Sequence, residues 1–176
     1  MIALLFTLVL VAPSLQLGPA MGPVGKINIK KLQECPNFSG GQLKMQLAKD
    51  SKGQKVFNAQ LNLQEDYNNK YTFLVRVHKW TGSEYKKDMM KYEGAACDYI
   101  NKFLPAVRER VYKLAKVSGT CEAKKGKYDI KAIFALEKDL KVPALPYGTF
   151  QLEVEIYNAK KAKIVCLVVD VDSVAK

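Results

Sequence analysis

Lys127-Tyr-Asp-Ile-Lys-Ala-Ile-Phe-Ala-Leu-Glu137 and Thr149-Phe-Gln-Leu-Glu-Val-Glu-Ile-Tyr157 are the two runs that decide the fold of this chain. Apolar residues recur at every second position in both: Tyr128, Ile130, Ala132, Phe134 and Leu136 in the first, and Phe150, Leu152, Val154 and Ile156 in the second. Successive strand side chains point to opposite faces, so each run predicts a strand with one dry and one solvated face. The connection, residues 142–148, contains two prolines, which cannot occupy a central strand, and Gly148, which permits a turn. We therefore predict two antiparallel strands joined by a rigid apolar connection.

Most of the remaining chain also has the alternation that is typical of strands. Further strands are predicted at 26–30, 42–49, around 57–63, at 71–80 and at 163–172, with a hairpin turn at 50–53. The run 163–172 is apolar on both faces near its middle, which indicates a strand inside a sheet. Residues 84–94 mix tyrosines and methionines with lysines, so an irregular strand and a mobile rim both remain open there.

A helical insertion interrupts the strands at 95–117. Val107, Val111, Leu114 and Ala115 recur there at intervals of about four residues, and Pro105 should separate a short first helix from a second. Seven or eight short strands with one helical insertion predict an all-β, antiparallel, immunoglobulin-like sandwich or cup. A chain of 176 residues suits a single domain, expected over 21–176.

The first residues predict export from the cell. Met1–Ala12 is apolar and too short to span a bilayer comfortably, and Gly18-Pro-Ala20 offers small residues for cleavage. We expect 1–20 to be a cleaved signal peptide and the protein to be secreted and extracellular. A buried first helix is the alternative, although this stretch has no polar face, and the absence of lysine and arginine before the apolar block departs from the usual signal.

Four cysteines lie in the part expected to be exported. An even set in an oxidising compartment predicts two disulfides, and Cys35, Cys97, Cys121 and Cys166 permit three pairings. No metal site is expected, because there is no Cys-x-x-Cys pair and His78 is the only histidine. The triplet Asn37-Phe-Ser39 makes Asn37 a glycosylation candidate.

The chain is strongly basic. It has 28 Lys and Arg against 17 Asp and Glu, a formal net charge of +11, with lysines spread along nearly its whole length. Such a spread usually marks a solvated surface, while attraction to anionic lipid headgroups is the functional alternative. Nucleic acid is not an expected partner, because the chain has no recognised binding motif and is expected to be exported.

Three local patterns coincide in order: Cys97-Asp-Tyr-Ile-Asn-Lys-Phe-Leu104, Cys121-Glu-Ala-Lys-Lys-Gly-Lys-Tyr128 and Val142-Pro-Ala-Leu-Pro-Tyr-Gly-Thr-Phe150. Together they resemble an insect family of secreted proteins that includes the CheB chemosensory proteins. They are also similar to the ganglioside activator protein and its broader ML class of lipid-recognition domains. Phe150 stands where that pattern usually has tyrosine, and Ala123 where it commonly has phenylalanine.

This resemblance implies a β-cup with an apolar cavity between its layers and the pairings Cys97–Cys121 and Cys35–Cys166. The activator protein has further cysteines that this chain lacks, which weakens any transfer of its enzyme-presenting role. The dry faces supply the expected cavity residues: Phe57, Phe73, Val75, Phe134, Leu136, Phe150, Leu152 and Val154. Amphipathic and flexible side chains are expected at the cavity mouth: Trp80, Met89, Met90, Leu145 and Tyr147.

The expected function is that of a secreted binding protein for a lipid or another long apolar ligand, with pheromone-type chemosensory transport or presentation as the finer expectation. An anionic membrane surface or a receptor is a further expected partner. The alternative is a secreted basic interaction protein, or a lipid-presenting activator, without a bound ligand. No enzyme activity and no cofactor are expected, since no nucleophile motif accompanies His78 and the cysteines are better used in disulfides.

Overall fold

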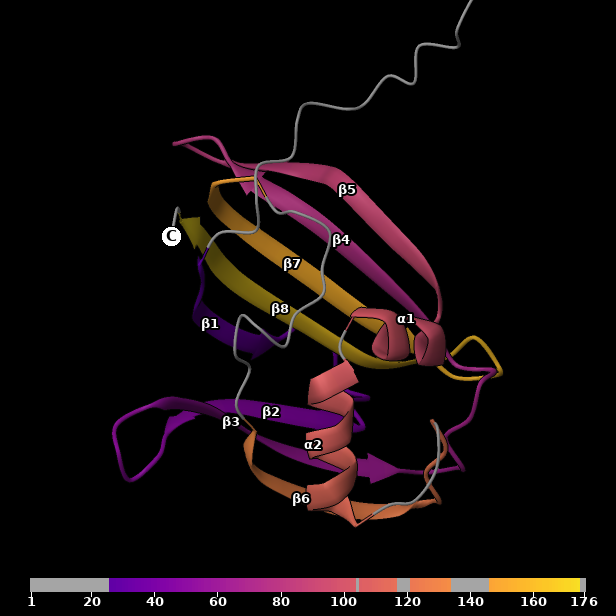
Figure 1. Ribbon diagram of the computed structural model, residues 1–176. Coiled ribbons are helices and arrows are strands. Elements are labelled where there is room, and N and C mark those ends of the chain that lie inside the picture. Colours follow the sequence, from indigo (N-terminus) through magenta and orange to yellow (C-terminus); the bar gives the residue numbers. More distant parts are fainter. Residues whose placement is uncertain (1–25, 104, 117–120, 134–145, 175–176) are drawn as a thin grey trace, which may run out of the picture.

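The computed structural model describes residues 26–103, 105–116, 121–133 and 146–174. Two antiparallel sheets form its two layers (Figure 1). Sheet A has the order β1 (Lys26–Glu34), β8 (Lys163–Val174), β7 (Gly148–Tyr157), β4 (Thr72–Trp80), β5 (Tyr85–Ala95). Sheet B has the order β2 (Leu43–Lys49), β3 (Lys55–Leu63), β6 (Gly126–Ile133). This is the all-β sandwich that the alternating runs predict.

Two short helices connect the sheets on one side. Helix α1 (Ala96–Phe103) follows β5 directly, and α2 (Pro105–Ala115) begins at the proline that was expected to separate two helices. Figure 1 shows α1 at one end of sheet A and α2 lying across sheet B. No helix in the described part of the chain has the length and apolar content needed to cross a membrane.

The two deciding runs do not pair with each other, which corrects the predicted pair. The described part of the first run lies in β6, which pairs with β3 at the edge of sheet B. The second forms β7, which lies in sheet A between β8 and β4. Alternation shows which face of a strand is dry but not which strand it pairs with, so it cannot distinguish a hairpin from two strands that belong to different sheets. The predicted residues Phe134, Leu136 and Leu145 lie outside the described residues.

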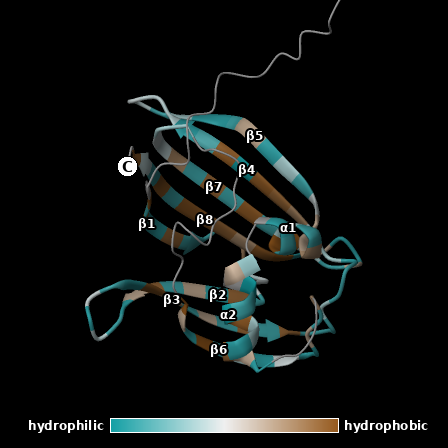
Figure 2. Cartoon of the chain, in the orientation of Figure 1, coloured by the Kyte–Doolittle hydropathy of each residue, from teal (hydrophilic) through white to brown (hydrophobic). Residues whose placement is uncertain are grey.

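The polar side chains of β7 have partners on neighbouring strands of sheet A, so β7 can occupy a central position in that sheet. Gln151 Nε2 donates to Asp170 Oδ1 on β8 at 2.9 Å, and Arg76 Nη1 on β4 lies 3.3 Å from Glu153 Oε1. Figure 2 shows the corresponding alternation of hydrophobic and hydrophilic positions along β4, β7 and β8. Strand β8, predicted to be internal, lies between β1 and β7.

The sequence left an irregular strand and a mobile rim open for residues 84–94, and the structure shows a strand there, β5. It is an edge strand of sheet A whose pairing with β4 shifts register between Val77 and Lys79, and Asp88 there has a φ of 53°. A bulge of this kind breaks strict alternation, which explains why 84–94 has no clear pattern. Leu114 is a second correction: the periodicity predicts it on the apolar side of α2, but it is 45% exposed.

Both disulfides join the pairs that the resemblance implies, Cys35–Cys166 and Cys97–Cys121. The first connects the end of β1 to β8 within sheet A. The second links the start of α1 to the segment that leads into β6, so the helical insertion is tied at both ends. A closed loop with a sequence separation of 24 residues restricts the helices to the neighbourhood of sheet B.

Candidate functional site

An apolar cavity of about 370 Å³ lies between sheet B, helix α2 and one end of sheet A. Its described lining consists of apolar side chains and tyrosines, without a charged group: Leu43, Met45, Phe57, Ala59, Leu61, Leu63, Tyr67, Ile100, Val111, Tyr112, Ala115, Ala123, Tyr128, Ile130, Ile133, Ile156, Ile164 and Val165. Pockets for small molecules usually occupy 300–1,000 Å³ and are mostly apolar. The size and the chemistry of the cavity therefore suit an apolar guest.

Strand geometry explains the floor of the cavity. Along β3, alternate residues from Phe57 to Leu63 face inward and the intervening polar residues face outward. On β6, Ile130 and Ile133 are three positions apart, yet both line the cavity. A bulge makes this possible: the register shifts between Phe57 and Ala59, and Ala132 has a φ of 54°.

Helix α2 supplies the facing wall. Val111 and Ala115 are four residues apart and lie on the same helical face, directed at the cavity with Tyr112. Next to this wall, Tyr67 and Ala123 form an isolated bridge, with the Tyr67 N–H donating to the Ala123 carbonyl at 2.8 Å. The Cys97–Cys121 disulfide holds α1 against the same segment. The wall is thus fixed by covalent and backbone contacts, and its lining faces stay apolar.

The tyrosines that line the cavity differ in how their hydroxyls are placed. Tyr128 donates its hydroxyl to the Lys124 carbonyl at 2.6 Å, which directs that group toward the segment before β6. The Tyr67 hydroxyl is buried without a hydrogen-bond partner among the described residues. Burial raises the pKa of Tyr67 well above its ordinary value, with smaller contributions from Tyr112 and Tyr71. The Tyr67 hydroxyl is therefore neutral at physiological pH, and ring carbons and alkyl groups make up most of the lining.

The structure divides the predicted cavity residues between two places. Phe57 lines the cavity. The other described candidates belong to sheet A and pack in or against a cluster around Val77 and Val171; they are Phe73, Val75, Phe150, Leu152 and Val154. Phe150 is fully buried, as expected of a core residue. A ligand contact by this second group remains a prediction.

The predicted mouth residues do not surround the described cavity. Trp80 and Tyr147 lie at the end of β4 and just before β7, whereas the cavity meets sheet A at Ile156 and Ile164, near its other end. Met89 and Met90 on β5 are half-buried against the Val77 cluster. A role of these residues at the mouth of a ligand cavity stays a prediction.

Sequence reasoning named Phe57 on β3 and the dry face of the run that forms β6 as cavity lining, but it did not place the inward face of β2 there. It also missed the contribution of α2. The only signal for it was the recurrence of Val111 and Ala115, which could not show which sheet the helix covers. The fold decides this, because the Cys97–Cys121 link and the Tyr67–Ala123 bridge bring α2 over sheet B.

A polar cluster covers the outer face of sheet A, away from the cavity. Glu155 is 1% exposed, accepts from the Tyr157 hydroxyl at 2.8 Å and from Arg76 at 3.1 Å, and pairs with Lys163. Burial alone would raise the pKa of the Glu155 carboxyl, but bonds from Lys163 and Tyr157 and the charge of Arg76 outweigh it and lower that pKa. Burial and the bond to Glu155 raise the pKa of Tyr157 to about 12. These partners satisfy one another, so the cluster stabilises the sheet.

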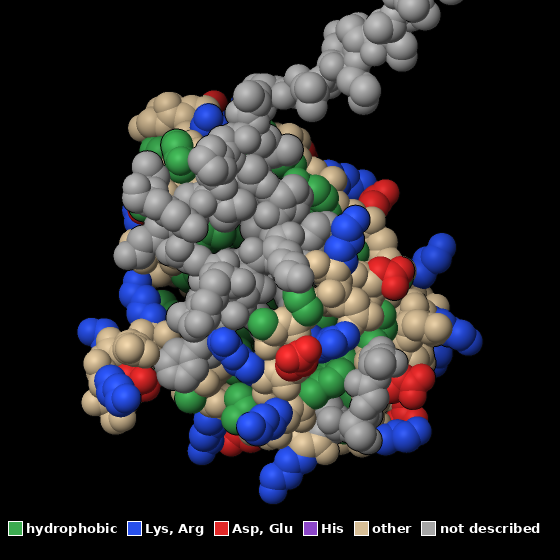
Figure 3. Space-filling view, viewed as in Figure 1, with side chains coloured by type: hydrophobic (Ala, Val, Ile, Leu, Met, Phe, Trp, Pro, Cys, Tyr) green, Lys and Arg blue, Asp and Glu red, His purple; other side chains and the backbone are tan. Residues whose placement is uncertain are grey.

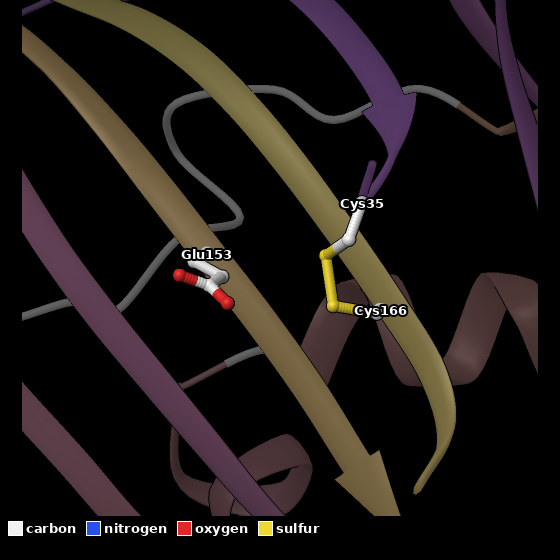
Figure 4. Close-up of side chains that lie close together, drawn as sticks. All are labelled: Cys35, Glu153 and Cys166. Carbon is white, nitrogen blue, oxygen red and sulfur yellow. A yellow bond between two sulfur atoms is a disulfide. The ribbon is translucent and has the colours of Figure 1, made fainter. Parts of the chain in front are cut away.

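The cluster includes one grouping with metal-ligand atoms among the described residues, Cys35, Glu153 and Cys166 (Figure 4). Its two sulfurs are joined in a disulfide, so neither is a thiolate that could ligate a metal. His78 is also buried here, with Nδ1 accepting the Asp88 N–H at 2.9 Å. That bond gives the histidine a packing role in the β4–β5 hairpin. Asn37 is exposed in the turn after Cys35, and its glycosylation stays a prediction.

Comparisons with known proteins find matches among solved structures only. No family profile matches the chain, and no curated protein matches it in sequence. Among solved structures, the chain is similar to chicken MD-1 complexed with lipid IVa, at 12% identity and a TM-score of 0.40. That alignment covers 87% of this chain and 94% of the MD-1 chain.

Proposed function

We propose that this protein binds an apolar molecule, such as the hydrocarbon chain of a lipid, in the cavity between sheet B and helix α2. The observation that carries the proposal is the cavity itself, about 370 Å³ with an uncharged lining of alkyl and aromatic groups. Each buried methylene of a ligand contributes about 0.8 kcal/mol. A saturated chain therefore gains affinity along its length without needing a specific polar partner.

The lining also determines which ligands are disfavoured. An ionised group inside the cavity would lose its hydration without meeting a described countercharge, which is strongly unfavourable. The polar end of a ligand therefore stays at the opening, where water reaches it. Figure 3 shows Lys and Arg side chains scattered over the visible surface among exposed hydrophobic ones. Such a surface tolerates headgroups of several kinds.

The finer proposal is that the protein is a secreted carrier, with pheromone-type chemosensory transport or presentation as its role. It is supported by the predicted signal peptide, by two disulfides of the kind that persist in oxidising compartments, and by the resemblance to the CheB group. We also propose that the protein is not an enzyme, because its described polar cluster is occupied by mutual hydrogen bonds and ion pairs.

Neighbouring positions on α2 provide a direct test. Ala115 lines the cavity, whereas Leu114 is exposed, so Ala115→Trp places an indole in the cavity and Leu114→Trp places one in solvent. Delipidated protein is titrated with the fluorescent apolar probe N-phenylnaphthylamine, and decanol is used to displace it. We expect Ala115→Trp to weaken both ligands at least tenfold and Leu114→Trp to leave both unchanged.

Equal affinities in the two variants, or no probe binding by the parent protein, would refute the proposal. The second outcome, together with no extractable apolar molecule by mass spectrometry, would instead favour an interaction protein with a filled core.

A further inference from the structure

One end of sheet A gathers exposed hydrophobic side chains. Strand β4 ends there at Trp80, β7 begins there just after Tyr147, and β8 ends there at Val174 (Figure 1). These three residues are 39%, 45% and 45% exposed, and they are three of the four large hydrophobics exposed in the described part of the chain. Residues 27 to 94 positions apart in sequence are brought together here because β4, β7 and β8 are neighbours.

This end is separate from the cavity. The cavity meets β7 at Ile156, eight residues beyond Gly148. At a rise of about 3.3 Å per residue the separation along the strand is about 26 Å. The exposed residues therefore do not form the cavity opening, and ligand binding does not account for them.

The tryptophan is held in its exposed position. Its ring contacts Tyr85 across the hairpin, with centroids 5.0 Å apart and a T-shaped arrangement. The turn is closed by the Thr81 N–H donating to the Glu84 carbonyl at 2.9 Å, and Gly82 adopts a φ of 105° that favours glycine. A short, hydrogen-bonded turn thus keeps the indole at the rim instead of letting it fold onto the sheet.

Three lysines lie beside these aromatic residues in the β4–β5 hairpin. Lys86 and Lys87 follow Tyr85 and are exposed, and neither has an ion-pair partner among the described residues. Lys79, next to Trp80, packs its side chain near Gly148 at the start of β7. Glu84 and Asp88 are the acidic residues of 79–88, so the three lysines leave this hairpin with a net charge of +1. Asp170 and Asp172 also interact electrostatically with Tyr85.

We propose that this aromatic end, formed by Trp80, Tyr85, Tyr147 and Val174 with Lys79, Lys86 and Lys87, docks on the surface of an anionic phospholipid bilayer. Tryptophan and tyrosine favour the headgroup region, where their rings are shielded and their polar atoms stay hydrated. Each lysine near an anionic surface strengthens binding roughly fivefold. A protein partner would require a matching acidic surface, whereas the interface of an anionic bilayer takes up exposed aromatic rings and lysines without a shaped counterpart.

The chain has a single tryptophan, so its intrinsic fluorescence reports on the proposed contact. Protein is mixed with vesicles of phosphatidylcholine alone or of phosphatidylcholine with phosphatidylserine. We expect a blue shift, and quenching by brominated acyl chains, with the phosphatidylserine vesicles and much less with the neutral ones. High salt should reverse the binding, because exposed charges are screened.

Matched variants separate this end from the general basicity of the protein. Lys86→Gln with Lys87→Gln should weaken partitioning roughly 25-fold, at about fivefold for each lysine. Lys44→Gln with Lys127→Gln removes the same charge from exposed positions on sheet B and should have little effect. Tyr147→Ser should weaken partitioning several-fold, whereas Leu114→Ser, which removes an equally exposed side chain from α2, should not.

The proposal is overturned if the tryptophan spectrum does not change on anionic vesicles, or if the sheet B variant loses as much affinity as the β5 variant. Probe titration distinguishes the two proposals: the β5 variant should keep its affinity for N-phenylnaphthylamine, since the cavity is unaltered. Loss of probe binding by the parent protein would refute the cavity proposal and leave docking standing.

Discussion

Ala59→Leu fills part of the cavity and should be tolerated by the fold. Ala59 is 3% exposed, lies on β3 and lines the cavity. The substitution adds three carbon atoms, which at about 0.8 kcal/mol each gives a favourable transfer term of up to about 2.4 kcal/mol. We expect the free energy of unfolding to stay unchanged or to rise toward that limit, because the added atoms enter space that the fold leaves free.

The same atoms displace ligand. A bound chain must give up about as many carbons as the leucine adds, so its binding weakens by up to about 2.4 kcal/mol, or roughly fiftyfold in Kd. Urea unfolding measures the first quantity, and titration with N-phenylnaphthylamine measures the second on the same preparation. Filling the cavity should thus conserve or increase stability while reducing affinity.

Ala96→Leu is the matched control. Ala96 is 2% exposed and packs with Tyr71 and Val165, and it does not line the cavity. The same three carbons must enter a packed region there, which typically costs about 1–3 kcal/mol of stability. If Ala59→Leu destabilised the protein as much as Ala96→Leu and left probe affinity unchanged, the reasoning about free volume would be wrong.

Other predictions concern the framework. Glu155→Gln should lower the free energy of unfolding at pH 7 by roughly 1.5–3 kcal/mol, since it removes the charged acceptor of Arg76, Lys163 and Tyr157; Glu93→Gln, on an exposed residue, should change it little. Because the folded pKa of Glu155 lies below its ordinary value, its contribution to the free energy of unfolding is present above about pH 4.5 and is lost as the pH falls through the folded pKa. If the free energy of unfolding fell equally with decreasing pH in the parent protein and in Glu155→Gln, this prediction would be contradicted. Replacing Cys97 and Cys121 together by serine should cost about 3.5 kcal/mol for a loop of this length, with intact Cys35–Cys166, as followed by urea unfolding; an unchanged midpoint would refute it. N-terminal sequencing of exported protein should begin after about residue 20, and Met1 at the N-terminus would exclude cleavage.

Most strands and both helices could be predicted from the sequence, because alternation and the position of Pro105 are local signals. It could not assign pairing. The outward residues Gln151 and Glu153 on β7 read as a solvated face, but in the fold they meet Asp170 and Arg76 from neighbouring strands. A polar face on a strand can therefore be satisfied by a neighbouring strand instead of by water, and only three-dimensional proximity distinguishes the two.

The sequence could predict an apolar cavity but not where in the fold the cavity lies. Apolar faces indicate that a cavity could form, yet its position depends on how the layers diverge and what covers the gap. Val111 on α2 and Ile164 on β8 meet in the cavity although they are far apart in sequence. Trp80 was expected at the mouth because it is amphipathic, but the direction of β4 carries it to the opposite end of sheet A.

Isoleucine methyl groups provide the most direct measurement of ligand position. Five isoleucines line the cavity, Ile100, Ile130, Ile133, Ile156 and Ile164, whereas Ile27 and Ile29 on β1 do not. In protein labelled at isoleucine methyls, bound decanol should give nuclear Overhauser contacts to the cavity group and none to Ile27 or Ile29. Contacts confined to the β1 methyls, or an unperturbed cavity group at saturating decanol, would contradict ligand binding between sheet B and α2.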